Sequence, residues 1–167
     1  MAIYENRTVI LGIRVAQAIC ALIVLGLSAY VADWWRSAYN YLDVGSPSQV
    51  NFLIFCAVWA LLALIYLILV PWKFATSVLH HKFAILGVEA VTMLFWFAGF
   101  IALAVFMTGR GCIGSVCQSA RAAVVFAAFS WVLWAATTAL ATLHVLRNRG
   151  TAASRKGDPN LQVQEGV

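Results

Sequence analysis

The sequence predicts an all-α membrane protein, an antiparallel bundle of four transmembrane helices. The chain has 167 residues, of which 63% are hydrophobic and 10% charged, and its mean hydropathy is +0.90. Soluble domains are about half apolar and about a quarter charged, so this composition excludes an ordinary soluble fold. The apolar residues also gather in long stretches, each close to or above the roughly 20 residues that cross the hydrocarbon of a bilayer.

Four stretches are long enough to span a membrane. They cover about residues 9–31, 50–70, 83–107 and 122–146. The first is too long for a cleavable signal peptide, and no small-residue cleavage site follows it. Pro47 precedes the second span and Pro71 ends it, where the missing N–H of proline costs little. We expect one transmembrane domain, 9–146, between a short N-terminal segment, 1–8, and a polar tail, 147–167.

The basic residues predict the orientation. An even number of spans places both termini on one side of the membrane, together with Lys73 and Lys82 in the connection between the second and third spans. Only Arg36, Arg110 and Arg121 fall on the other side. The positive-inside rule therefore places both termini in the cytoplasm.

The tail is polar and contains Gly and Pro, and we expect it to be disordered. Basic residues on the cytoplasmic side are candidate contacts for anionic inner-leaflet lipid, at roughly 1 kcal/mol each near the surface. They are Lys73, Lys82, Arg147, Arg149, Arg155 and Lys156. The net charge of +5 is spread along the membrane borders and forms no stripe with stacking aromatics, so nucleic acid is not an expected partner.

The two outward loops differ in character. Residues 32–51 contain Trp34 and Trp35, which we interpret as interfacial anchors, with contact to a lipid headgroup or a partner as the alternative. Residues 108–122 contain Cys112 and Cys117, which are expected to form a disulfide in the oxidising exterior. Their spacing, with no histidine nearby, is a poor zinc site.

One acid and one base lie inside the spans. Glu89 is about six residues into the third span and Arg14 about five into the first, both from the cytoplasmic side. At 1.5 Å per residue both lie roughly 8 to 9 Å deep. A lone carboxylate in hydrocarbon is costly, and charged residues in spans pair or face the bundle interior. We therefore predict an Arg14–Glu89 ion pair.

The residues at helical spacing around this pair predict two inward faces. They are Arg14, Gln17, Ala21 and Ser28 on the first span, and Glu89, Thr92, Trp96 and Gly99 on the third. One acid near one end does not make a relay across about 30 Å of hydrocarbon, so a structural role in helix register is favoured. Proton or ion coupling and recognition of a lipid headgroup are the alternatives.

Four tryptophans lie inside the expected spans: Trp59, Trp96, Trp131 and Trp134. Rings that face lipid could hold the flat face of a sterol, whereas rings that face inward would fill the core. Core packing is favoured because a buried indole N–H needs a partner, which Thr92, Thr137 or Thr138 could supply. Together with Trp34 and Trp35, the four remain candidate lipid contacts.

Catalytic and metal chemistry have little support. The histidines His80, His81 and His144 lie at the cytoplasmic ends without a carboxylate or cysteine close in sequence. No nucleophile–base constellation, phosphate-binding loop or dinucleotide fingerprint is present in the sequence. We expect no catalytic residue, no metal and no cofactor.

Three stretches resemble fungal MARVEL-domain proteins: SPSQVNF, HKFAILGVEAVTMLFWFAGFIALAV and CIGSVCQSARAAVVFAAFSWVLWAATT. The resemblance covers about residues 8–147 and implies four transmembrane helices, cytoplasmic termini and a cysteine pair in the second outward loop, matching Cys112 and Cys117. It also implies roles in membrane apposition, vesicle traffic and lipid-domain organisation. Fungal members include proteins of the plasma-membrane compartment overlying eisosomes, which is linked to sphingolipid- and sterol-rich domains.

The favoured function is a non-enzymatic scaffold that organises plasma-membrane lipid domains or vesicle traffic. It would contact sterol or sphingolipid and self-associate, since small-residue stripes such as Gly12, Ala16 and Cys20 fit contacts between chains. The alternative is a small proton- or ion-coupled channel or transporter that uses Arg14 and Glu89.

Overall fold

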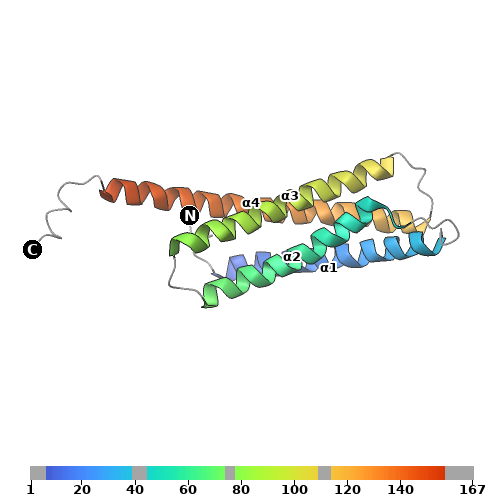
Figure 1. Cartoon of the computed structure of the whole chain (residues 1–167), viewed down its shortest axis with the longest axis horizontal. Helices are drawn as coiled ribbons and strands as arrows, with labels where there is room; N and C mark the ends of the chain where they lie inside the picture. The colour runs from blue at the N-terminus through green and yellow to red at the C-terminus, as the bar shows by residue number, and fades with distance from the viewer. Residues whose placement is uncertain (1–6, 39–44, 74–77, 109–113, 157–167) are drawn as a thin grey trace, which may run out of the picture.

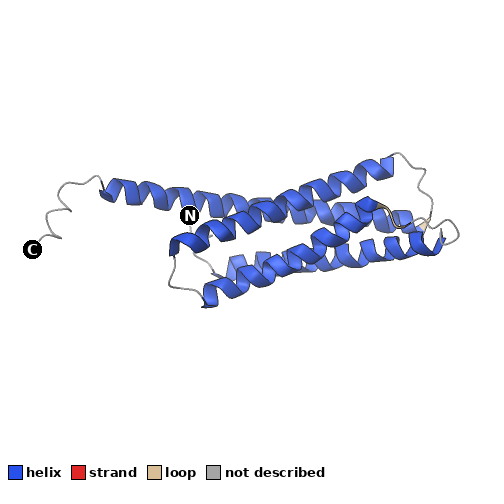
Figure 2. Ribbon diagram, in the orientation of Figure 1, coloured by secondary structure: helices blue, strands red, loops and turns tan. Residues whose placement is uncertain are grey.

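The computed structural model describes residues 7–38, 45–73, 78–108 and 114–156 (Figure 1). Its elements are α1 (Arg7–Ala38), α2 (Ser48–Lys73), α3 (Val78–Thr108) and α4 (Ser115–Lys156). Figure 2 shows these four helices, with a short loop before α2, and no strand in the described ranges.

The four helices run alternately up and down, so the start of α1 and the end of α4 lie toward the same end of the bundle (Figure 1). Each helix packs against two neighbours, in the order α1, α2, α3, α4 and back to α1. The helices α1 and α3 are therefore diagonal partners, and a side chain that links them must pass through the middle of the bundle.

All four helices are long and apolar enough to cross a membrane. The candidate spans are Thr8–Ala38, Ser48–Leu69, Ala84–Thr108 and Ser115–Leu143. Many large apolar side chains lie on their outer faces, and Leu22, Leu62 and Phe129 are more than half exposed, while the exposed charges Asp33, Arg36 and Arg121 lie near the helix ends. An apolar surface of this extent fits lipid and not water. The predicted fold class, an all-α antiparallel four-span bundle, is confirmed.

The helices extend further than the expected spans. The helix α1 continues past Val31 to Ala38, so Trp34 and Trp35 are helical, and α4 begins at Ser115 instead of about residue 122. The tail that we expected to be disordered is helical as far as Lys156, while residues 157–167 lie outside the described residues. Hydropathy marks where lipid contact ends, but a helix continues while its residues tolerate helical geometry, and residues 147–156 contain no proline.

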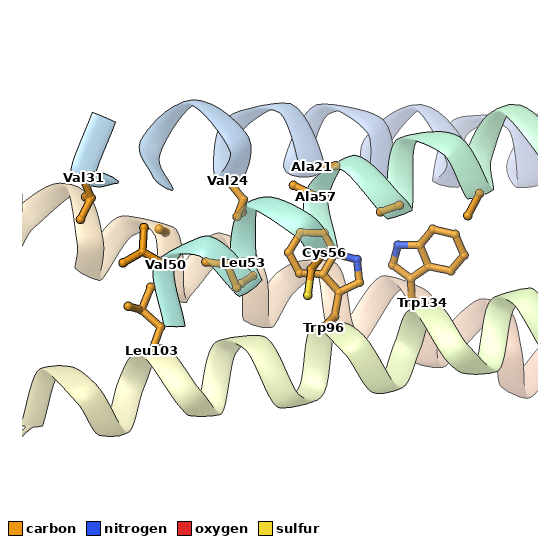
Figure 3. Close-up of a cluster of buried hydrophobic side chains, with 14 of the residues drawn as sticks. Ala21, Val24, Val31, Val50, Leu53, Cys56, Ala57, Trp96, Leu103 and Trp134 are labelled. Atoms are coloured by element: carbon orange, nitrogen blue, oxygen red, sulfur yellow. The ribbon is translucent and has the colours of Figure 1, made fainter. Parts of the chain in front are cut away.

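The core changes in character along the bundle (Figure 3). At one end Val24, Val31, Val50, Leu53 and Leu103 are buried against one another. Toward the other end the large buried side chains are Trp96 and Trp134, both 0% exposed.

The helices α2 and α3 approach closely at Gly99. A Cβ at this position would lie 2.8 Å from Leu53 Cδ1 and 3.4 Å from Cys56 Sγ. Small residues at such contacts let helix backbones approach one another in membranes. The glycine therefore makes room for the buried leucine of α2.

Candidate functional site

The centre of the site is an ion pair that crosses the bundle. Arg14 of α1 and Glu89 of α3 form a salt bridge between Nη2 and Oε1, and their side chains are 11% and 2% exposed. Since α1 and α3 are diagonal partners, the pair lies in the interior and not on a lipid-facing groove between adjacent helices. Both charges are thereby removed from the hydrocarbon.

Hydrogen bonds connect this pair to α4. Arg14 Nη1 donates to Gln17 Oε1 at 3.1 Å, and Gln17 Nε2 donates to Thr137 Oγ1 at 3.4 Å. The Thr137 hydroxyl in turn donates to the backbone carbonyl of Trp134 at 3.1 Å. The guanidinium of Arg14 also lies over the Trp134 ring, 5.5 Å from its centroid, in cation–π geometry. Arg14 of α1 thus contacts α3 through Glu89 and α4 through Trp134.

The helix α2 is linked to the same hydrogen-bond network one turn further along α3. Trp59 Nε1 donates to Thr92 Oγ1 at 3.1 Å, and that hydroxyl donates to the carbonyl of Val88 at 2.7 Å. Thr92 lies three residues after Glu89, on the same face of α3. Every helix therefore contributes a polar group to this half of the core. We call these residues, Arg14, Gln17, Trp59, Glu89, Thr92, Trp134 and Thr137, the polar core.

Some buried polar atoms have no partner among the residues that the structure describes. They are Ser28 Oγ, Glu89 Oε2, Trp96 Nε1, Trp134 Nε1 and Thr138 Oγ1. Glu89 is thus held through one carboxylate oxygen only, and its second oxygen is a buried acceptor that remains available.

The candidate lipid-contact tryptophans separate into two groups. Trp96 and Trp134 are fully buried, so the structure places them in the core instead of against lipid. Trp34 is 43% exposed, and Trp35 is partly buried with its ring 6.4 Å from that of Phe106.

Trp59 and Trp131 are partly buried at the surface, each within an aromatic cluster. The α2–α3 cluster contains Phe52, Phe55, Trp59 and Phe95, with ring centroids 5.6 to 6.3 Å apart. The α3–α4 cluster contains Phe97, Phe100 and Trp131, with centroids 5.5 to 5.9 Å apart. Phe55 and Phe97 are 47% and 43% exposed, so both clusters reach the outer surface.

The cysteines differ in state. Cys20 and Cys56 are free, and Cys56 Sγ donates to the Phe95 carbonyl at 3.4 Å, across the α2–α3 contact. Cys117 lies in the first turn of α4, where it is buried and has an interaction partner. Cys112 lies outside the described residues. The Cys112–Cys117 disulfide stays a prediction.

The basic residues proposed as lipid contacts lie at the helix ends nearest the chain termini. Lys73 ends α2, Lys82 is near the start of α3, and the other four are in the last ten residues of α4. Their contacts with anionic lipid stay predictions. Within the described ranges, no three His, Cys, Asp or Glu residues gather in a way that could hold a metal ion.

The network contains contacts that sequence reasoning did not find. Helical spacing identified Gln17 and Thr92 as inward-facing, but it did not predict that Gln17 bonds to Thr137 or that Arg14 lies over Trp134. The only sequence signal was that Trp134 and Thr137 stand three residues apart, which places them on one face of α4.

Four apolar spans closed around a buried ion pair define an integral membrane protein whose charges inside the bilayer are turned inward. The chain belongs to the MARVEL family, since residues 6–140 match that family's Membrane-associating domain. This match includes the whole polar core and ends inside α4. Neither a curated protein nor a solved structure matches the chain.

Proposed function

We propose that this protein is a non-enzymatic scaffold that contacts lipid along its outer surface, self-associates, and so organises plasma-membrane lipid domains or vesicle traffic. The proposal is carried by one observation: Arg14 and Glu89 are paired across the interior, while large apolar and aromatic side chains are exposed along the outer faces. Family membership supports it, because the matched domain is membrane-associating.

The two exposed aromatic clusters are the surfaces that we propose for lipid. Grouped rings present flat, rigid apolar area with little side-chain entropy to lose, which suits the flat face of a sterol or an ordered sphingolipid chain. Phe55 of the α2–α3 cluster and Phe97 of the α3–α4 cluster are the most exposed members. Trp34, at the opposite end of the bundle from the polar core, is a further candidate for the headgroup region.

The test is lipid mass spectrometry on protein extracted with its surrounding bilayer, with particle size measured on the same sample. We expect sterol or sphingolipid to be enriched over the bulk membrane, and enrichment to fall in Phe55→Leu and Phe97→Leu. Leu22→Ala, which trims an exposed aliphatic residue on α1, is the control and should keep the enrichment. A co-purified lipid composition equal to that of the bulk membrane would contradict lipid organisation by direct contact.

Self-association is proposed from the outer face of α1. Gly12 is exposed, and a Cβ built there would meet nothing within 4 Å, so this small residue is not used for packing inside the bundle. Gly12→Leu should therefore reduce the oligomer fraction without affecting the fold of the single chain. An unchanged particle size would mean that the chains associate through a face other than that of α1.

The location and orientation are proposals as well. The resemblance to fungal members makes the plasma-membrane compartment that overlies eisosomes the first place to examine, by microscopy of the tagged protein with a marker of that compartment. Protease accessibility of tags at both termini tests the orientation, and protection of both tags in intact cells is the expected result.

One observation favours the second candidate, a proton- or ion-coupled carrier. Glu89 Oε2 is a buried acceptor with no partner among the described residues, as a titrating or ion-binding carboxylate would be. Flux measurements in liposomes separate the two functions. A carrier shows flux that Glu89→Gln abolishes, whereas the scaffold shows none in either protein.

A further inference from the structure

Two indole groups in the core carry N–H donors that the protein leaves without an acceptor. Trp96 of α3 and Trp134 of α4 are both 0% exposed, and neither Nε1 has a hydrogen-bond partner in the described part of the chain. Figure 3 shows the two indole nitrogens directed toward one another across the core. The helices that carry them are neighbours in the bundle.

The two groups cannot satisfy each other. An indole Nε1–H is a donor only, so a facing pair of them needs an acceptor from elsewhere. Backbone carbonyls in the middle of α3 and α4 are already used by helical hydrogen bonds. By contrast, Trp59 of α2, which is only partly buried, has an acceptor in Thr92 Oγ1 at 3.1 Å. Among the buried indole groups that the structure describes, the unmet donors are those of the facing pair.

Two unpartnered acceptors lie on the same helices and toward the same end of the bundle. Glu89 Oε2 is seven residues before Trp96 on α3, and Thr138 Oγ1 is four residues after Trp134 on α4. Because α3 and α4 are antiparallel, both acceptors are displaced from the indole pair toward the end that contains the Arg14–Glu89 salt bridge. The unmet donors and the unmet acceptors thus lie along the same stretch of α3 and α4.

We propose that the bundle binds internal water between Trp96 and Trp134, in a site that continues toward Glu89 Oε2. A water molecule has two lone pairs for the two N–H groups and two protons for acceptors on the other side. Buried waters usually bond to polar groups that the protein leaves unpaired. The site takes a small neutral acceptor, since its donors are neutral and Arg14 is already bonded to Glu89 and Gln17.

A lipid headgroup does not fit this site. Both tryptophans are sealed from the surface, and Glu89 is 2% exposed, so no headgroup oxygen could enter without separating the helices. The path also ends inside the protein, because Leu53 and Leu103 close the core beyond Trp96 (Figure 3). The inferred water therefore occupies one half of the core, between the tryptophan pair and Glu89, and does not form a passage across the bilayer. The inferred water site does not depend on which lipid the outer surface binds.

The test is NMR of full-length protein in nanodiscs, with the tryptophan indole nitrogens labelled. The chain has 7 tryptophans, and Phe variants of the other five assign the two remaining signals to Trp96 and Trp134 as a pair, even if these two cannot be replaced. We expect direct magnetisation transfer from water to both indole protons, with the sign of a long-lived bound molecule, and hydrogen-bonded chemical shifts. Trp59 is the matched control and should show a hydrogen-bonded shift without transfer from bound water, since its acceptor is Thr92.

The outcomes decide the proposal in either direction. Where Trp96→Phe folds, it should weaken the water signal at Trp134, because the shared molecule loses one of its two donors, and Trp131→Phe should leave it unchanged. Hydrogen-bonded shifts without water transfer would mean that the protein supplies an acceptor, and free-indole shifts would mean that the site is dry. Either of these results at both tryptophans overturns the proposal.

Discussion

The two halves of the bundle core are built on different principles. In the half that contains the start of α1 and the end of α4, Arg14, Glu89 and their hydrogen-bond partners join four helices through polar contacts. In the other half, Leu53, Leu103 and Val50 are in contact without a polar partner among them. Apolar packing in a membrane is weakly selective, because lipid tails are as apolar as the core, whereas a buried charge has one satisfactory partner. The comparison suggests that the polar half sets helix order and register and that the apolar half supplies close packing.

The largest effect is expected when one partner of the ion pair is removed. Glu89→Leu leaves the Arg14 guanidinium uncompensated in the interior, and breaking a buried pair in this way costs about 3–5 kcal/mol. Unfolding in mixed micelles with increasing denaturing detergent measures the loss. If the pair mainly specifies register, the double variant Arg14→Met with Glu89→Leu should recover most of the stability, because it removes both charges. A double variant as unstable as the single one would show that the pair contributes net stability.

A second prediction concerns the apolar half. Leu103 is 2% exposed, so Leu103→Ala should cost about 2 kcal/mol, at the low end of the range for buried leucine truncations, because in a membrane the cavity contributes and transfer to water does not. The matched control is Leu62→Ala, since Leu62 is 59% exposed and faces the surroundings. The same micelle unfolding assay applies. Equal losses for Leu103→Ala and Leu62→Ala would mean that the apolar half is not packed as a protein core.

The sequence predicted the inward faces of α1 and α3 because helical spacing and depth depend on local geometry. Arg14 with Gln17, and Glu89 with Thr92, could be assigned to inward faces before any fold was known. The contacts to α4 could not be predicted, since periodicity shows which residues share a face and not which helix lies opposite. Core packing was favoured for Trp96 and Trp134, and both are buried, but hydropathy contributed nothing to that prediction. In a membrane, core and surface are both apolar, so hydropathy does not distinguish them.

The third prediction tests how closely α2 and α3 approach between the two halves. Gly99→Ala places a methyl group 2.8 Å from Leu53 Cδ1, and overpacking a tight contact costs about 1–3 kcal/mol. We expect the lower end, because a leucine terminus can shift. Gly87→Ala on the same helix is the control, since a Cβ there meets nothing within 4 Å. It should be neutral or slightly stabilising. A Gly99→Ala protein as stable as Gly87→Ala would place α2 and α3 further apart than described.

The smallest effect is expected for the hydrogen bond that brings α2 into the polar core. Trp59 Nε1 donates to Thr92 Oγ1, so a double-mutant cycle with Trp59→Phe and Thr92→Val isolates their coupling. Membrane hydrogen bonds measured in this way average about 0.6 kcal/mol, and we expect a coupling of that size. The same cycle between Trp131→Phe and Thr92→Val should give none, because Trp131 belongs to the α3–α4 cluster. If neither cycle shows coupling, α2 is held in the bundle by packing alone. The polar half would then set the arrangement of three helices instead of four.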